Sequence, residues 1–288
     1  GFRGYLTSLG TALVCLSGWM LWQYRKLSFG VVDFLLAMSI PVALAAAIAL
    51  VNSKRIASWP LVFRTLAGGG LVSAVLVPYI FSMYKNAGVE AYLRMVIEQL
   101  TTSMGAVEGE GMDVAIMKSI LNPETILNMT RRIIADTFVA VLFVITFLGH
   151  WIGTRMAGRD TSRATALPRL EDFYVPAGLI WPFLAGWALV LVPRMPALQA
   201  MRGRQGLEAV AWNLALVVSF CYAAQGLGIL RHILGRLSPN GFLRWLGTLL
   251  VVLLLFNYVT GAWAAGVLTV FGATETWIPY RISKGVQT

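Results

Sequence analysis

Charged residues are scarce in this chain, and their scarcity argues against a soluble fold. Only 12% of the 288 residues are Asp, Glu, Lys or Arg, whereas 58% are hydrophobic, and the mean hydropathy is +0.72. A soluble domain usually has about 25% charged residues. Charge-poor stretches such as 30–51 and 175–193 are long enough to cross a bilayer, which takes about 20 apolar residues in a helix. The composition therefore predicts a membrane protein.

Cysteine and histidine are also scarce, which leaves little material for a metal or catalytic site. Cys15 and Cys221 both fall inside apolar stretches, so we expect buried packing residues and no disulfide. His150 and His232 stand next to predicted helix ends, where interfacial or helix-dipole roles are favoured over catalysis. Phosphate-loop, paired zinc-histidine and nucleophile-elbow patterns are missing. The sequence thus predicts a non-enzymatic protein without catalytic residues, metal or cofactor, and a membrane-embedded enzyme is the least favoured alternative.

The net charge of +10 does not indicate a nucleic-acid partner. The 23 Lys and Arg residues are spread between apolar segments instead of being gathered on one soluble face. In such positions they meet anionic headgroups and set the orientation of the helices in the bilayer. The basic residues are therefore expected to interact with the lipid bilayer.

Apolar segments separated by short charged loops predict seven transmembrane helices. The chain is therefore expected to be an all-α, polytopic membrane protein with a single membrane domain over 1–288. The last segment has about 30 residues, too many for one untilted crossing at about 1.5 Å per residue. It is either one long helix that leaves the membrane or two short helices with a break at 257–261. The predicted segments are 6–23, 31–51, 59–83, 133–154, 175–192, 209–230 and 242–271.

The positive charges predict which side of the membrane each loop occupies. Taken in alternation, the short loops of one side carry far more Lys and Arg than those of the other, and the positive-inside rule makes that side cytoplasmic. Arg281 and Lys284 favour the broken form of the last segment, which returns the C-terminal end to the cytoplasmic side. The cytoplasmic set is Arg3, Lys54, Arg55, Arg64, Arg155, Arg159, Arg163, Arg169, Arg231, Arg236 and Arg244, and the opposite set is Arg25, Lys26, Arg194, Arg202 and Arg204.

One long connection, 85–130, is acidic and is predicted to lie outside. Its apolar residues recur at helical spacing and give an amphipathic helix, which the glycines at 105–111 end. A second short apolar stretch follows at 112–121. Asn122, Pro123 and Glu124 then have the pattern of an N-cap, a first-turn proline and a first-turn acid, so a helix can run from there into the fourth span. The sequence predicts external amphipathic helices that lie on the outer surface.

Polar residues inside predicted spans are the candidate ligand-binding residues, because polar groups are costly in lipid. Arg132 and Asp136 are four residues apart and can pair on one helix face. The pair is either a neutralised ion pair near the outer interface or part of a site for a ligand or a proton. Asn213, like Gln225 and Asn257, can hydrogen-bond between helices, and Asn213 is the third candidate for ligand binding. So few buried charges do not favour ion-coupled pumping.

Small residues four apart predict close helix contacts. Ala45 with Ala49, and Gly149 with Gly153, are the candidate partner-docking residues. The Ala-rich stretch after Pro41 gives the second span a smooth wall. Packing within the chain and docking of another membrane protein both remain open.

Four stretches of the chain carry a resemblance to a known family. They are Val96-Ile97-Glu98-Gln99-Leu100; Leu167-Pro168-Arg169-Leu170-Glu171-Asp172-Phe173 with Val175-Pro176 and Trp181; Tyr222 with Gln225-Gly226-Leu227-Gly228; and Gly272 to Arg281, in which Glu275 precedes Tyr280-Arg281. Together they resemble the YybS-like family of bacterial integral membrane proteins, over about the last two thirds of the chain.

The resemblance implies a location and two kinds of function. A member of this family is expected in the bacterial inner membrane as a multi-pass protein, and the family is distantly similar to the S-components of energy-coupling-factor transporters and to MreD. The first similarity implies a transport component that binds a small molecule from outside and docks onto a coupling subunit. The second implies a scaffold that holds partner membrane proteins in a complex. The expected function is the transport component, with the scaffold as its alternative.

Overall fold

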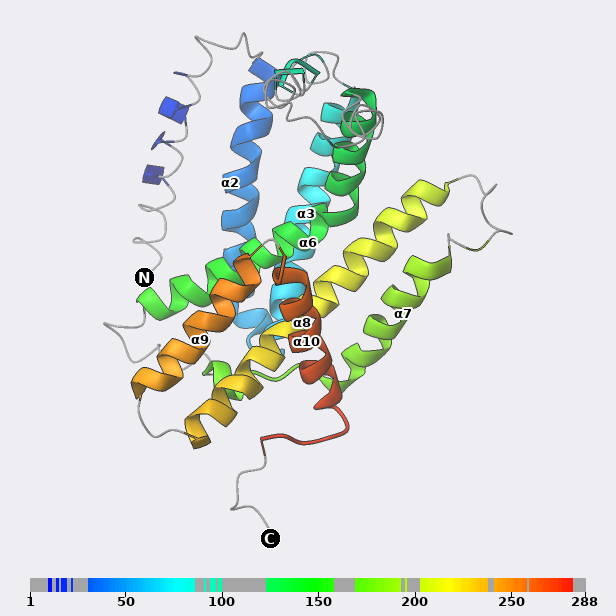
Figure 1. The fold of residues 1–288 in the computed structure, drawn as a ribbon. Coiled ribbons are helices and arrows are strands. Elements are labelled where there is room, and N and C mark those ends of the chain that lie inside the picture. The colour runs from blue at the N-terminus through cyan, green and yellow to red at the C-terminus, as the bar shows by residue number, and fades with distance from the viewer. Residues whose placement is uncertain are drawn as a thin grey trace.

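A computed structural model describes five stretches of the chain: 31–85, 123–157, 169–192, 203–237 and 241–281 without residue 258, together with isolated positions within 10–22, 91–99 and at 195. All regular structure in these stretches is helical (Figure 1), which agrees with the predicted all-α class. The predicted first span and most of the external segment before residue 123 lie outside the described residues. The helices are α2 (Val31–Val51), α3 (Leu61–Lys85), α6 (Pro123–Ala157), α7 (Ile180–Leu191), α8 (Arg204–Leu237), α9 (Gly241–Phe256) and α10 (Gly261–Thr274), with the short 3-10 turns η1 (Lys54–Ile56), η4 (Leu170–Asp172) and η5 (Ala177–Leu179).

Two of these helices are long and apolar enough to cross a membrane. They are the segments Glu124–Arg155 of α6 and Arg204–Arg236 of α8. The described helices α7, α9 and α10 have only 12, 16 and 14 residues, short of the roughly 20 that a full crossing needs. The predicted count of seven spans is therefore not supported by the described part of the chain.

The last apolar segment is broken into two short helices, which was one of the two alternatives predicted for it. α9 ends at Phe256 and α10 begins at Gly261. The Asn257 side chain holds the turn, because its Oδ1 accepts hydrogen bonds from the backbone N–H groups of Val259 (2.9 Å) and Thr260 (3.1 Å). These side-chain bonds satisfy backbone donors at the point where the helical ladder stops.

Apolar side chains cover the exposed faces of the helices as well as the faces that pack against other helices. On α6, Val141, Ile145, Leu148 and Ile152 are each between 43% and 53% exposed, and their spacing places them on one face. A soluble protein rarely exposes such a continuous apolar face, whereas lipid favours it. The exposed pattern agrees with the membrane class that the composition predicts.

α8 is the central helix, and it contacts α6, α7, α9, α10 and η4. Figure 1 shows it crossing the molecule between α7 and α9. Aromatic rings fill the largest buried cluster. Their centroids lie 5.4 to 6.1 Å apart, and three of the four pairs are edge-to-face, an arrangement that aromatic rings favour. The rings in these contacts are Phe143, Phe147, Phe173 and Phe220.

Glycine lets α8 and α10 touch backbone to backbone. A Cβ on Gly272 would stand 1.9 Å from the carbonyl oxygen of Tyr222, and one on Gly226 would stand 2.0 Å from that of Leu268. These distances leave no room for any side chain. The two helices can therefore approach this closely only with glycine at both positions.

We expect Gly272→Ala to destabilise the protein by about 3 kcal/mol, because the new methyl group forces the two backbones apart. Gly266 on the same helix is a matched control, since a Cβ there meets no atom within 4 Å. Gly266→Ala should be neutral or slightly stabilising, because alanine favours a helix over glycine. Unfolding of both variants in mild detergent, followed by far-UV circular dichroism, measures the difference, and equal stability of the two would contradict the contact.

Candidate functional site

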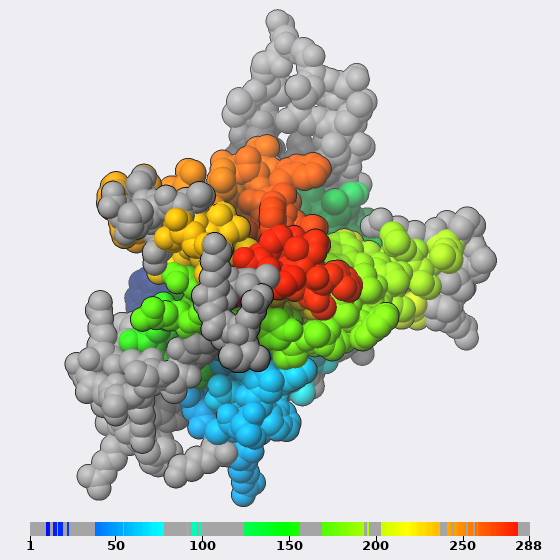
Figure 2. Space-filling view, turned by 90° about the horizontal axis from the view of Figure 1, so that it is seen from below, coloured from blue at the N-terminus to red at the C-terminus, as the bar shows by residue number. Residues whose placement is uncertain are grey.

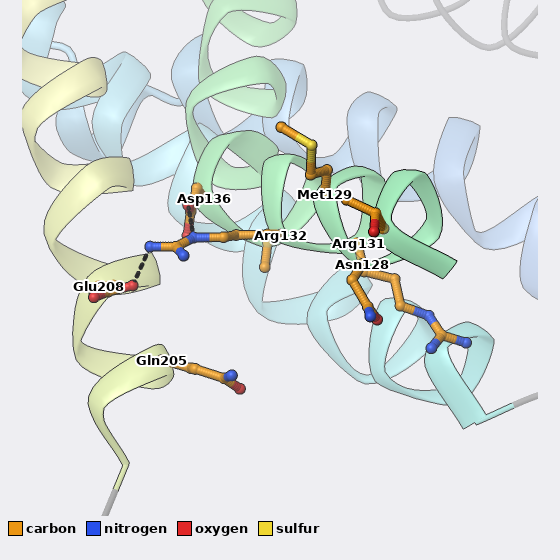
Figure 3. A pocket seen from close by; sticks show the side chains of 9 residues that line it. Asn128, Met129, Arg131, Arg132, Asp136, Gln205 and Glu208 are labelled. Carbon is orange, nitrogen blue, oxygen red and sulfur yellow. Dashed lines mark hydrogen bonds and ion pairs between the residues drawn. The ribbon is translucent and has the colours of Figure 1, made fainter. Parts of the chain in front are cut away.

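Charged side chains meet where α6 and α8 begin their shared contact (Figure 3). The Arg132 guanidinium lies between two acids: its Nε is 3.6 Å from Oδ2 of Asp136, and its Nη2 donates to Oε2 of Glu208. Arg204, one turn before Glu208 on α8, donates from Nε to Glu208 Oε1 at 2.9 Å. The side chains of Asp136 and Glu208 are 15% and 9% exposed, so both carboxylates depend on these cations for compensation.

A cavity of about 700 Å³ opens beside this network. Its size is typical of small-molecule sites. Its lining is partly apolar and also includes cationic and anionic side chains that can donate and accept hydrogen bonds. Figure 3 shows that its lining side chains come from the N-terminal part of α6 and the first turns of α8. The lining residues are Thr125, Asn128, Met129, Arg131, Arg132, Ala135, Asp136, Gln205 and Glu208.

Asn213 shapes the helix that forms this cavity. Its Oδ1 accepts from the backbone N–H of Val139 (2.8 Å) and Ala140 (3.2 Å), and its Nδ2 donates to the carbonyl of Ala135 (2.7 Å). Those backbone groups belong to the helical ladder of α6, and a side chain inserted into the ladder is an established cause of a bend. Figure 3 shows α6 changing direction near Asp136, so Asn213 satisfies the backbone groups at that bend.

The structure brings together two of the three predicted ligand-binding residues. Arg132 and Asp136 line the cavity and are ion-paired with each other, whereas Asn213 binds the backbone of α6 and is absent from the lining. Glu208 completes the site and was missed by sequence reasoning. The signal that could have found it is its spacing of four residues from Arg204, the same spacing that singled out Arg132 and Asp136.

The predicted docking residues differ in how exposed they are. Ala45 is buried on α2 while Ala49 is exposed. On α6, Gly149 and Gly153 are both exposed, and a Cβ on either would meet no atom within 4 Å. The glycine pair therefore leaves a smooth open strip on α6, and its role in docking stays a prediction.

A second polar network lies deep in the C-terminal half of α8, around Gln225, which is 1% exposed. Its Oε1 accepts from the backbone N–H of Val175 (2.6 Å), and its Nε2 donates to Glu275 (2.8 Å) and to the carbonyl of Gly272 (3.1 Å). Arg281 closes the network, since its Nε donates to Glu275 Oε1 at 2.7 Å.

The Arg281 guanidinium also fixes the segment before α7. Its Nη1 donates to the backbone carbonyls of Glu171 (2.7 Å) and Phe173 (2.9 Å). Figure 2 shows the C-terminal segment, in red, seated between the yellow-green α7 region and the yellow end of α8. Three of the stretches on which the family resemblance rests therefore meet in space: Leu170–Val175, Gln225–Gly228 and Gly272–Arg281. Their shared role here is to close the fold at this end.

We expect Arg281→Met to destabilise the protein by about 3 kcal/mol or more, because it leaves Glu275 buried without a cation. The double variant with Glu275→Gln should recover part of the loss. Arg231→Met is the matched control: Arg231 donates to Glu171 at 3.0 Å in a pair whose side chains are 36% and 22% exposed, so its loss should cost about 1 kcal/mol or less. Denaturant unfolding in detergent tests this ranking, which an equal effect of the two single variants would refute.

The comparisons with known proteins identify the family and go no further. A family described as "Predicted membrane protein (DUF2232)" matches residues 26–271, which is most of the chain, and the chain belongs to that family. Neither the curated proteins nor the solved structures contain a significant match.

Proposed function

We propose that this membrane protein is a non-enzymatic component that binds a small polar molecule in the cavity between α6 and α8. The observation that carries the proposal is the cavity itself. It has the volume of a small-molecule site, and it is lined by Arg132, Asp136 and Glu208. Polar groups of this kind are costly in an apolar environment and are usually retained there for function.

The chemistry of the lining favours a ligand with both donors and acceptors. Arg132 presents a guanidinium on a side chain that is 62% exposed, while Asp136 and Glu208 present carboxylate oxygens. A zwitterion, or a neutral molecule rich in hydroxyl and amide groups, matches that mixture. Such a ligand would form hydrogen bonds to these side chains in place of some of their present ion pairs, so little of their charge would be left uncompensated.

The proposal includes a multi-pass arrangement in the bacterial inner membrane, in which the cavity would be reached from outside. In Figure 1 successive described helices run in alternating directions, and α6 and α8 both begin at the same end of the molecule. That end is the external one if the Lys- and Arg-rich loops are cytoplasmic. The ligand would then enter from outside near the first turns of α6 and α8, as is expected of a transport component of the S-component kind.

We expect Asp136→Asn and Arg132→Gln each to lower the amount of small molecule that co-purifies with the protein by about thirty-fold. Asp136→Asn removes one of the two carboxylates that hold Arg132, and Arg132→Gln leaves Asp136 without its cation. Arg155→Gln, at the other end of α6, is the control and should retain the wild-type amount. The measurement is mass spectrometry of the small molecules released from each purified protein. Wild-type retention by both cavity variants would remove the site from consideration.

A scaffold function is the second candidate, and the open strip at Gly149 and Gly153 favours it. Small residues let two helices approach closely in a membrane, and this strip faces no other described segment of the chain. The strip could equally dock a transport component onto its coupling subunit. A membrane-protein partner is therefore part of both candidates.

Gly149→Leu with Gly153→Leu separates the two candidates. If the protein is only a scaffold, this double variant should lose its co-purifying membrane proteins, and Asp136→Asn should retain them with no small molecule found in any sample. If it is a transport component, the glycine variant should keep its small molecule while it loses its partners. Affinity purification in mild detergent with protein and small-molecule mass spectrometry gives both readouts.

A further inference from the structure

The ion pairs beside the cavity form a row of alternating charge that ends at Asp136. Arg204 donates to Glu208 at 2.9 Å, Glu208 also accepts from Arg132, and Nε of Arg132 lies 3.6 Å from Oδ2 of Asp136. Glu208 therefore stands between two cations and Arg132 between two acids, whereas Asp136 has Arg132 alone. The row as a whole is neutral.

Asp136 is the least satisfied member of this row. Its 3.6 Å contact with Arg132 is longer than a hydrogen bond, and no other side chain or backbone group among the described residues donates to it. Its oxygens are open to the cavity instead of being enclosed by the chain. A carboxylate on a side chain that is only 15% exposed gains most from a charged donor. Asp136 can therefore accept hydrogen bonds from a cationic group that enters the cavity.

Arg132 has donors to spare beside that acceptor. Its Nε faces Asp136 and its Nη2 donates to Glu208, while its Nη1 has no partner among the described residues. Figure 3 shows this third nitrogen turned away from both acids, on a side chain that is 62% exposed. A guanidinium presents its donors in a planar fork that fits a carboxylate. The cavity thus offers a donor for an anion directly beside an acceptor for a cation.

The short distance between these two groups limits the ligand. Since Arg132 and Asp136 are only 3.6 Å apart, a molecule that pairs with both must carry its own cation and anion close together. An ammonium and a carboxylate on one carbon atom meet this condition, whereas the same groups at the two ends of a chain do not. Such a pair also keeps the row neutral, while a phosphate would bring excess negative charge beside Asp136 and Glu208. Arg131, the other cation of the lining, points away from the row in Figure 3.

We propose that the cavity binds an α-amino acid, or a larger molecule with an α-amino carboxylate, whose ammonium pairs with Asp136 and whose carboxylate pairs with Arg132. This rests on the proposed function, because it names the class of molecule that the cavity takes. The hydroxyl of Thr125 and the amides of Asn128 and Gln205 are the other polar groups of the lining, and they are left for the side chain of the ligand.

The test compares 2-aminobutyrate with its isomer 4-aminobutyrate, which has the same atoms and charges at a wider spacing. Butyrate lacks the ammonium and propylamine lacks the carboxylate, so these two probes measure each charge separately. Isothermal titration calorimetry of the full chain in phosphatidylcholine nanodiscs, with empty nanodiscs as the blank, gives the four dissociation constants. We expect 2-aminobutyrate to bind about tenfold or more tightly than each of the other three, because only it makes both charge-assisted contacts.

Two variants assign the contacts to their residues. In Asp136→Asn the ammonium should no longer add affinity, so 2-aminobutyrate should bind no better than butyrate. In Arg132→Gln the carboxylate should no longer add affinity, so 2-aminobutyrate should bind no better than propylamine. Glu124→Gln is the matched control: it makes the same acid-to-amide change on α6, at a side chain that is 69% exposed and outside the lining, and should bind as wild type does. If one variant fails to fold, the other and the four probes still decide.

The outcomes separate this inference from the proposed function. Binding of 4-aminobutyrate or of a singly charged probe as tightly as 2-aminobutyrate would overturn the amino-acid class and leave the cavity as a small-molecule site. If no probe binds, the small molecule released from the purified protein decides: one with an α-amino carboxylate supports the inference, and one without it overturns the inference alone. If no probe binds and no small molecule is released, both the inference and the proposed function are wrong.

Discussion

Buried polar groups must find partners inside an apolar bundle, and along α8 this requirement is met at successive levels of one helix. Glu208 near its start holds the cations of the cavity, Asn213 binds the backbone of α6, and Gln225 binds the segment before α7 and the end of α10. In lipid the alternative to each of these contacts is an unsatisfied group that costs several kcal/mol. α8 is thus the axis from which its neighbours are placed.

The cavity is a consequence of one of these contacts. Asn213 supplies hydrogen bonds that a straight α6 would make within itself, so the bend near Asp136 leaves few backbone groups unpaired. The bend brings the first turns of α6 beside the start of α8, where Arg132 reaches Glu208. α6 therefore combines a packed, apolar C-terminal part with a polar N-terminal part that lines the cavity.

Sequence reasoning predicted the local features of this arrangement and missed the long-range ones. The helical class, the break at 257–261 and the pairing of Arg132 with Asp136 each follow from residues close together in the chain, where periodicity and spacing are informative. The contact of Arg132 with Glu208 joins residues 76 positions apart, and that of Arg281 with Phe173 joins residues 108 apart. No local pattern specifies such pairs. The count of seven spans is not supported by the described residues, because hydropathy cannot separate a crossing helix from a shorter apolar helix such as α7.

The central claim is that the cavity between α6 and α8 holds a ligand, and an experimental density map tests it most directly. The protein would be transferred from its native membrane into lipid nanodiscs without detergent washing, and its structure determined by electron cryo-microscopy. We expect separate non-protein density in the cavity, in contact with Arg132 and with Asp136 or Glu208. A cavity closed by its own side chains, with α6 straight and no additional density, would contradict it.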